Sequence, residues 1–288
     1  MKTALKNFKK GLLAYNSGDF AAALHEWRAL AEQGYAKAQN SLGMLYSKGL
    51  GVPQDYEEAV YWYHKAAEQA FAPAQYNLGV RYFEGQGISQ DYQEAIRWFC
   101  KAAEQGVVQA QNNLGAMYSK GRGTSKNFKE AVNWYRKAAE QWDAKAQFNL
   151  GVMYTKGRGV SQNYAEAVNW YQKAAGQGYA SAQNNLGSMY RRGQGVTKDL
   201  VEAVNWYQKA AEQKNSLAQN NLGVIYSKGR GITKNNIYAH MWMDIAATNG
   251  RANAVRNRDI LAKKMTAVEI SKAQALAREC VKKNYKGC

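Results

Sequence analysis

One short motif returns along this chain at a constant spacing of 36 residues. AQNSLG comes back with changes only at its third and fourth residues, and its six copies end at Gly43, Gly79, Gly115, Gly151, Gly187 and Gly223. A fixed period of roughly 20–50 residues is the signature of a repeat protein, in which each unit buries its apolar face only against its neighbours. We therefore expect the chain to fold as an array of stacked units.

Residues 36–71 show what the first half of a unit should fold into. Ala38, Leu42 and Tyr46 recur at helical spacing, so they predict the buried stripe of a first helix. Gly49 follows, and glycine readily adopts the left-handed conformation that closes a helix. The first helix is therefore expected to end there.

A second helix is predicted after a short loop. Asp55 is expected to accept hydrogen bonds from the N–H groups of the first turn, and Glu58 to reach back to the cap. The same pair returns as Asp91/Glu94, Asn127/Glu130, Asn163/Glu166 and Asp199/Glu202. Ala59, Tyr63 and Ala66 form the apolar stripe of this helix, so each unit should be a two-helix hairpin.

The repeated pattern A-x-A-Q-x-x-L-G-x-x-Y-x-x-G-x-G-V-x-x-D-Y-x-E-A-x-x-W-Y-x-K-A-A-E-Q-G resembles the Sel-1-like repeat, a relative of the tetratricopeptide repeat. The resemblance covers six units, residues 36–250. It implies an all-α fold, a right-handed α-solenoid of stacked antiparallel helix pairs. It also implies an adaptor that holds other proteins together, often in bacterial signalling, envelope or host-contact settings.

Both ends of the chain depart from the pattern. Residues 1–35 read as a divergent, tetratricopeptide-like capping hairpin, and residues 251–288 as C-terminal capping helices with a basic tail. Thr266 and Glu269 predict a capping box that opens a last helix, which should run to about Val281. A polar outer face is what the terminal unit of such an array requires.

The net charge of +17, from 39 Lys and Arg against 22 Asp and Glu, favours acidic partners. No nucleic-acid-binding motif matches, so no nucleic acid is expected. No stretch approaches the roughly 18 apolar residues of a membrane-spanning helix. We expect a monomer that binds a protein or peptide.

Residues that could support catalysis are scattered. The histidines at 25, 64 and 240 fall in separate helices, and no metal or nucleotide motif is present. No serine has a lysine three residues later, although some cysteine-rich relatives are described as β-lactamases. We therefore expect no catalytic residue, no metal ligand and no cofactor.

The most promising surface is the face of the first helices opposite their apolar stripe. It carries a row of asparagines at Asn77, Asn113, Asn149, Asn185 and Asn221. A basic row follows at Lys120, Lys156, Arg192 and Lys228. Asparagine can both donate to and accept from a peptide backbone, and the basic row favours an acidic ligand or a free carboxylate. In tetratricopeptide-like solenoids the first helices line the concave surface, so these rows are candidates for a binding groove. The alternative is that each asparagine only bonds within the array.

Two further features have alternative interpretations. The tryptophans at 62, 98, 134, 170, 206 and 242 could form a stacking platform, but core packing is the preferred interpretation. Cys280 and Cys288 are either two ordinary thiols or a disulfide that pins the tail, which requires an oxidising compartment.

The compartment stays open at this stage. The first residues contain no apolar leader segment, which favours the cytoplasm. The cysteine pair and the envelope context of relatives favour a periplasmic or secreted protein, and that is our expectation.

Taken together, these features predict a non-enzymatic scaffold that binds a peptide or protein surface in the groove. Two alternatives remain open. One is an envelope-associated hydrolase with weak β-lactamase-like activity, and the other is a basic surface that binds an anionic polymer or membrane.

Overall fold

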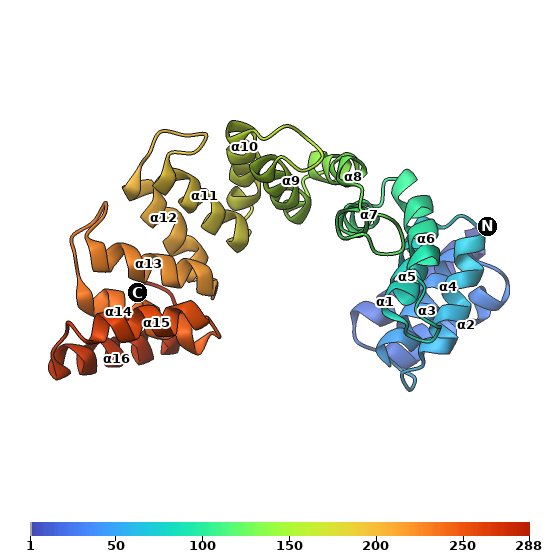
Figure 1. Cartoon of the computed structure of the whole chain (residues 1–288). Helices are drawn as coiled ribbons and strands as arrows, with labels where there is room; N and C mark the ends of the chain where they lie inside the picture. The colour runs from blue at the N-terminus through green and yellow to red at the C-terminus, as the bar shows by residue number, and fades with distance from the viewer. Residues whose placement is uncertain (1) are drawn as a thin grey trace. The chain divides into compact units, whose positions relative to one another are not determined.

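The computed structural model describes residues 2–288, and all regular structure in that range is helical (Figure 1). The chain divides into two compact units, residues 1–141 (unit 1) and residues 142–288 (unit 2), and each is described by itself. Across residues 2–288 no helix is both long and apolar enough to cross a membrane.

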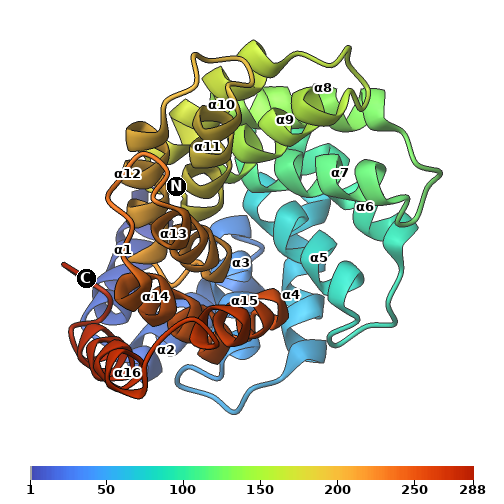
Figure 2. The ribbon, with the colours of Figure 1, turned by 60° about the vertical axis from the view of Figure 1, so that its left-hand side comes forward.

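The described part of unit 1, residues 2–141, contains eight helices, each packed on the next in chain order (Figure 2). They are α1 (Lys2–Asn16), α2 (Phe20–Glu32), α3 (Ala36–Lys48), α4 (Tyr56–Glu68), α5 (Ala72–Glu84), α6 (Tyr92–Glu104), α7 (Val108–Lys120) and α8 (Phe128–Glu140). From α3 onward, odd-numbered helices are first helices of a repeat and even-numbered helices are second helices.

Unit 2 continues the same order. It contains α9 (Ala144–Lys156), α10 (Tyr164–Gly176), α11 (Ala180–Arg192), α12 (Leu200–Ala211), α13 (Ser216–Lys228), α14 (Asn236–Thr248), α15 (Ala252–Ala262) and α16 (Ala267–Lys282). The last helix, α16, packs against α14. The prediction of an all-α fold made of stacked helix pairs is confirmed.

The helices begin and end where the cap residues predict. Gly49 closes α3 in the left-handed conformation, with φ of 65°. The Asp55 carboxylate accepts hydrogen bonds from the backbone N–H groups of Glu57 and Glu58, at 2.9 and 3.0 Å. Both the predicted C-cap and the predicted N-cap are therefore present.

The reciprocal half of the predicted capping boxes is absent from the second helices in residues 2–288. Only Thr266 and Glu269 at α16 form the complete box. In α6 and α8 the glutamate has a partner one turn on: Glu94 pairs with Arg97, and Glu130 accepts from Asn133 at 3.4 Å. A side chain at i+3 on the helix surface competes with the cap for the carboxylate.

Small residues allow the two helices of a hairpin to approach closely. A Cβ atom added to Gly115 of α7 would lie 2.5 Å from Cδ1 of Tyr135 in α8. Ala110 of α7 and Ala131 of α8 are fully buried. The aromatic ring therefore occupies the space that a side chain at position 115 would need.

A buried glutamine joins three consecutive helices in the repeats. Gln75 of α5 donates to the Ala67 carbonyl of α4 at 3.3 Å and accepts from Gln105 of α6 at 2.8 Å. We call this arrangement the glutamine clasp. In unit 2, Gln219 donates to Ala211 at 3.1 Å and accepts from Asn249 at 3.0 Å. Because buried polar groups need partners, the clasp fixes the register of each hairpin on its neighbour.

The turn after the second helix uses a left-handed residue in every repeat. Gly106 and Gly178 occupy it with φ of 88° and 84°. Ala70, Trp142 and Lys214 occupy the equivalent positions with φ of 58–64°, although side chains disfavour that conformation.

The C-terminal tail is attached to unit 2 covalently and by packing. Cys280 and Cys288 form a disulfide with their Cα atoms 5.6 Å apart. Between them, Tyr285 is buried in the same apolar cluster as Tyr207 and Trp242. The Lys214 ammonium lies 5.5 Å from the centre of the Tyr285 ring. The tail thus covers the end of the last repeat.

Candidate functional site

In unit 1 the candidate surface lies on α3, α5 and α7. Asn77 and Asn113 are half-buried, and Lys120 is exposed at the end of α7. We use the name first-helix strip for the asparagine row, the small residues three positions later and the charged row four positions beyond those. The small row, which includes Val80 and Ala116, is half-buried between the other two.

In unit 2 the first-helix strip lies on α9, α11 and α13. The three asparagines, Asn149, Asn185 and Asn221, are half-buried. The three basic residues, Lys156, Arg192 and Lys228, are exposed. Each unit thus presents its predicted residues on one side of its first helices, with amides toward the helix stack and charges toward solvent.

The strip asparagines also hold neighbouring repeats together. Asn77 donates to Oδ1 of Asn40 at 2.9 Å, and Asn221 donates to Oδ1 of Asn184 at 3.0 Å. Asn185 accepts from Asn184 at 3.3 Å. A primary amide has two N–H donors and two acceptor lone pairs, so one such bond does not exhaust it.

Asn40, Asn184 and their equivalents were not singled out in the sequence. Their signal is the doubled asparagine of AQNNLG, in which the first residue accepts the bond from the next repeat. The buried Gln39, Gln111 and Gln183 of the same motif, members of the glutamine clasp, were missed for the same reason. The repeated motif gives the period of the array directly, whereas the hydrogen bonds between its polar side chains become apparent only in the structure.

The charged row differs between the units. In unit 1 its second member is Glu84, which pairs with Arg81 at 3.3 Å. The guanidinium of Arg81 also lies over the Tyr56 ring, 5.4 Å from its centre. In unit 2 all three members of the row are cationic. The surface of unit 2 is therefore the more favourable one for an acidic ligand.

The strip extends one repeat further than the sequence motif. Asn257, Ile260 and Lys264 lie 36 residues after Asn221, Val224 and Lys228. Asn257 donates to Oδ1 of Asn220 at 2.9 Å, the same bond that Asn221 makes to Asn184. The helix α15 therefore stacks as the first helix of a seventh repeat.

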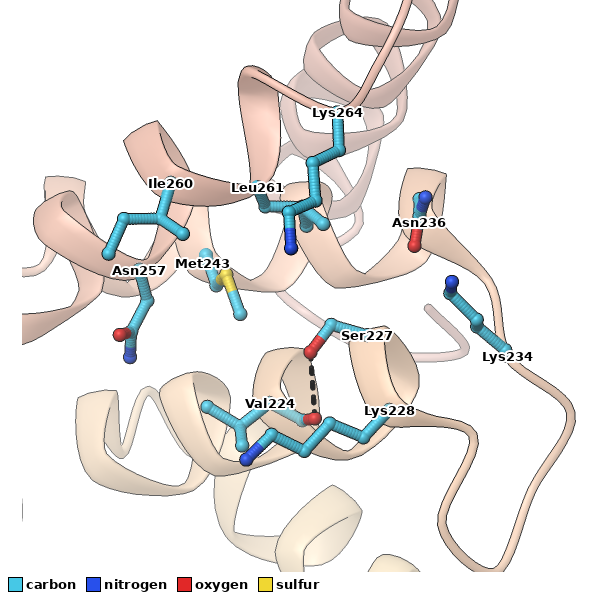
Figure 3. A pocket seen from close by; sticks show the side chains of 10 residues that line it. All are labelled: Val224, Ser227, Lys228, Lys234, Asn236, Met243, Asn257, Ile260, Leu261 and Lys264. Carbon is cyan, nitrogen blue, oxygen red and sulfur yellow. Dashed lines mark hydrogen bonds between the residues drawn. The ribbon is translucent and has the colours of Figure 1, made fainter.

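A pocket of about 420 Å³ lies between α13, α14 and α15 (Figure 3). Val224 and Lys228 line it from α13, and Ile260 and Lys264 from α15 and its end. The Ser227 hydroxyl at its edge donates to the Val224 carbonyl at 2.9 Å. The pocket thus lies between the strip residues of α13 and those of α15.

The tryptophan row is partly enclosed, since Trp62, Trp170 and Trp206 are half-buried and the other three are buried. Trp98 and Trp134 are each 8% exposed, and Trp242 is fully buried. Lysines one turn on cover the exposed ring faces, with Lys101 4.0 Å from the ring centre of Trp98 and Lys137 4.3 Å from that of Trp134. These contacts favour core packing over an open stacking platform.

Within residues 2–288 no group of three or more His, Cys, Asp and Glu side chains could hold a metal ion. His240 is buried in α14, and burial lowers the pKa of its imidazole below the usual value, because the apolar surroundings disfavour the charged form. Asp244 raises this pKa to a lesser extent, and Arg258 lowers it.

The geometry of the repeats matches a known family. The family model named Sel1 repeat matches residues 36–71, 72–107, 108–141, 144–179, 180–215 and 216–250. The chain belongs to the Sel1 repeat family. The Sel1 repeat fold is typical of protein-interaction scaffolds, which are generally non-enzymatic.

Solved structures of Sel1 repeat proteins are similar to this chain. A Sel1 repeat protein from Oxalobacter formigenes is 39% identical, with a TM-score of 0.76; the alignment covers 83% of this chain and 96% of that one. The protective antigen c5321 of uropathogenic Escherichia coli, which displays an SLR fold, is 28% identical, with a TM-score of 0.35; the alignment covers 98% of this chain and 93% of the antigen. No curated protein matches the chain significantly.

Proposed function

We infer that this Sel1 repeat protein is a non-enzymatic scaffold that binds an acidic protein or peptide along its first-helix strip. The observation that carries the proposal is the repeated juxtaposition of half-buried amides with an exposed basic row on α9, α11 and α13. An extended segment could bond its backbone to the amides while its carboxylates meet the basic residues.

The bonds between repeats are compatible with this role. Asn221 uses one N–H group for Asn184, at 3.0 Å, and its amide keeps further donor and acceptor capacity. The same bond fixes the orientation of the amide before a ligand arrives. Such preorganisation reduces the entropy that binding has to offset.

The test uses the immobilised full-length chain to capture a partner, which is then purified and titrated. Asn149→Ala with Asn185→Ala should weaken binding about thirtyfold, since two hydrogen bonds of roughly 1 kcal/mol each are removed. Asn169→Ala with Asn205→Ala is the matched control, because both asparagines are exposed on second helices of the same unit.

Circular dichroism and a thermal melt show whether a variant that binds more weakly is still folded. Both double variants should retain the helicity of the wild-type protein. If a helical Asn149/Asn185 variant binds the purified partner as tightly as the wild type, the asparagines only hold the array together and the proposal is wrong. Binding that disappears with salt at the same rate for every acidic polymer would instead indicate an unspecific basic surface.

A further inference from the structure

The pocket at the end of the first-helix strip has an unbalanced charge. Lys228, Lys234 and Lys264 line it, and no Asp or Glu does so among the residues that the structure describes. None of these three lysines belongs to an ion pair within residues 2–288. Three lysine side chains that line one cavity without an acidic residue give it a positive potential, which favours an anionic ligand.

The floor of the same pocket is apolar. Met243 and Leu261 are buried beneath it, and Val224 is half-buried. Ile260 at the rim is 50% exposed, which is high for a large aliphatic side chain in a helix that is packed on its neighbour. A ligand that covered Ile260 and reached the floor would remove apolar surface from water.

A buried acceptor adds a third requirement. Oδ1 of Asn236, which lines the pocket at the start of α14, is buried and has no hydrogen-bond partner in the structure. A buried carbonyl oxygen without a donor is unfavourable. Figure 3 shows the Asn236 amide and Lys234 on one side of the pocket, and Lys264 reaching across it above Ser227.

These three properties select a ligand by its chemistry. It must carry an anionic group for the lysines, an apolar group for the floor and an N–H donor for Asn236. An inorganic anion has only the first of these, and a fatty acid lacks the donor. A peptide with a carboxylate beside an apolar side chain has all three, and the main chain supplies the N–H group.

We propose that this pocket anchors an acidic peptide segment, with a carboxylate among Lys228, Lys234 and Lys264 and the adjacent apolar side chain on Met243 and Leu261. The proposal rests on the proposed function, since it names the end of the strip at which the partner is held. The carboxylate can come from a chain terminus or from an acidic side chain.

The test uses fluorescein-labelled peptides and the full-length protein. The probes are GSGSEL, GSGSEV and GSGSEF, each as the free acid and as the C-terminal amide, together with GSGSQL amide and GSGSES. Fluorescence anisotropy at about 150 mM salt should show saturable binding of the acidic probes that end in an apolar residue. GSGSQL amide and GSGSES should bind about tenfold more weakly. Comparison of acid and amide tells which carboxylate is used.

The variant Lys228→Glu with Lys264→Glu should weaken binding of the best probe by at least about tenfold. The matched control is Lys263→Glu with Lys272→Glu, which makes the same charge change at exposed positions outside the pocket. If the two variants lose the same affinity for the probe, the net charge of the protein and not the pocket binds the peptide. The proposed anchor pocket is then wrong. It is also wrong if inorganic phosphate displaces the probe as well as unlabelled peptide does.

The outcome can be separated from that of the proposed function. If no probe binds while a captured partner still depends on Asn149 and Asn185, the scaffold function stands and the anchor pocket does not. If probes bind at the pocket but the asparagine variant binds its partner normally, the pocket stands and the strip is structural.

Discussion

The charged row of unit 1 reads Lys48, Glu84 and Lys120, whereas that of unit 2 reads Lys156, Arg192 and Lys228. Beneath these rows the two units are built alike, with a glutamine clasp and a close-packed glycine in successive repeats. Unit 1 neutralises part of its surface through Arg81 and Glu84, and unit 2 ends in a pocket that lysines surround. The interior thus maintains the fold in both units, while the surface distinguishes what each can bind.

The interior should respond equally in both units. Gln75→Leu in unit 1 and Gln219→Leu in unit 2 each remove two hydrogen bonds of the clasp, although the Ala67 and Ala211 carbonyls keep a backbone N–H donor. Each substitution should therefore lower the free energy of unfolding by about 2 kcal/mol, since one hydrogen bond contributes roughly 1 kcal/mol. Urea denaturation followed by circular dichroism measures this, with the exposed Gln172→Leu as the control. A cost confined to one unit would show that the clasps are not equivalent.

Close packing at the helical glycines should distinguish individual repeats and not the units, because an added Cβ at Gly151 of unit 2 would also lie 2.6 Å from the Tyr171 ring. An added Cβ lies 2.5 Å from the Tyr135 ring at Gly115, but no nearer than 3.0 Å to any neighbour at Gly187. Overpacking costs about 1–3 kcal/mol, and alanine regains about 1 kcal/mol of helix propensity. Gly115→Ala should therefore destabilise by about 1–2 kcal/mol and Gly187→Ala by less than about 1 kcal/mol. Thermal melts of the two variants would contradict this if their order were reversed.

The surface difference predicts which unit an acidic ligand prefers. Lys156→Glu with Arg192→Glu should weaken binding of a long glutamate-rich peptide about tenfold, or 1.4 kcal/mol. Lys48→Glu with Lys120→Glu should weaken it by less than about threefold, because Glu84 already interrupts that row. Isothermal titration calorimetry of the two variants at equal salt compares the units directly. Equal losses would mean that the peptide responds only to net charge.

His240 gives unit 2 a pH dependence that the equivalent positions lack, since Val60 and Val204 stand there in other repeats. Burial lowers the pKa of folded His240, so the unfolded chain binds the proton more readily. Stability is full above the unfolded pKa of about 6.5 and should fall as the pH drops below it. Between about pH 5 and pH 7, the urea midpoint of the His240→Val variant should therefore change less with pH than that of the wild type. An unchanged slope would mean that His240 does not set the pH dependence of unit 2 in this range.

Repetition made the architecture predictable from sequence. Gly49 predicted the end of α3 and Asp55 the start of α4. Thr266 and Glu269 predicted the start of α16. The charged and amide rows of the strip followed from helical geometry alone, since residues at fixed phase on one helix share a face. Only the reciprocal cap bonds of the second helices were predicted wrongly, because local partners such as Arg97 take the carboxylate.

The pocket was not predictable in the same way. It depends on α15 continuing the stack after the sequence motif has faded, with few residues in phase, such as Ala254, Asn257 and Ile260. It also depends on Met243, which stands where earlier second helices have an aromatic ring such as Tyr207. Such a space arises from the packing of three helices, so no single segment contains its signal.

The alternation of the turn after the second helix bears on how the array can be engineered. Ala70 and Lys214 hold a conformation that Gly106 and Gly178 hold without a side chain. A left-handed residue with a Cβ costs roughly 1 kcal/mol, and both side chains are exposed. Glycine at position 70 should therefore raise thermostability, whereas Lys214→Gly would also remove the contact of the Lys214 ammonium with the Tyr285 ring. A consensus built from this chain should adopt the glycine form only at turns whose side chain makes no such contact.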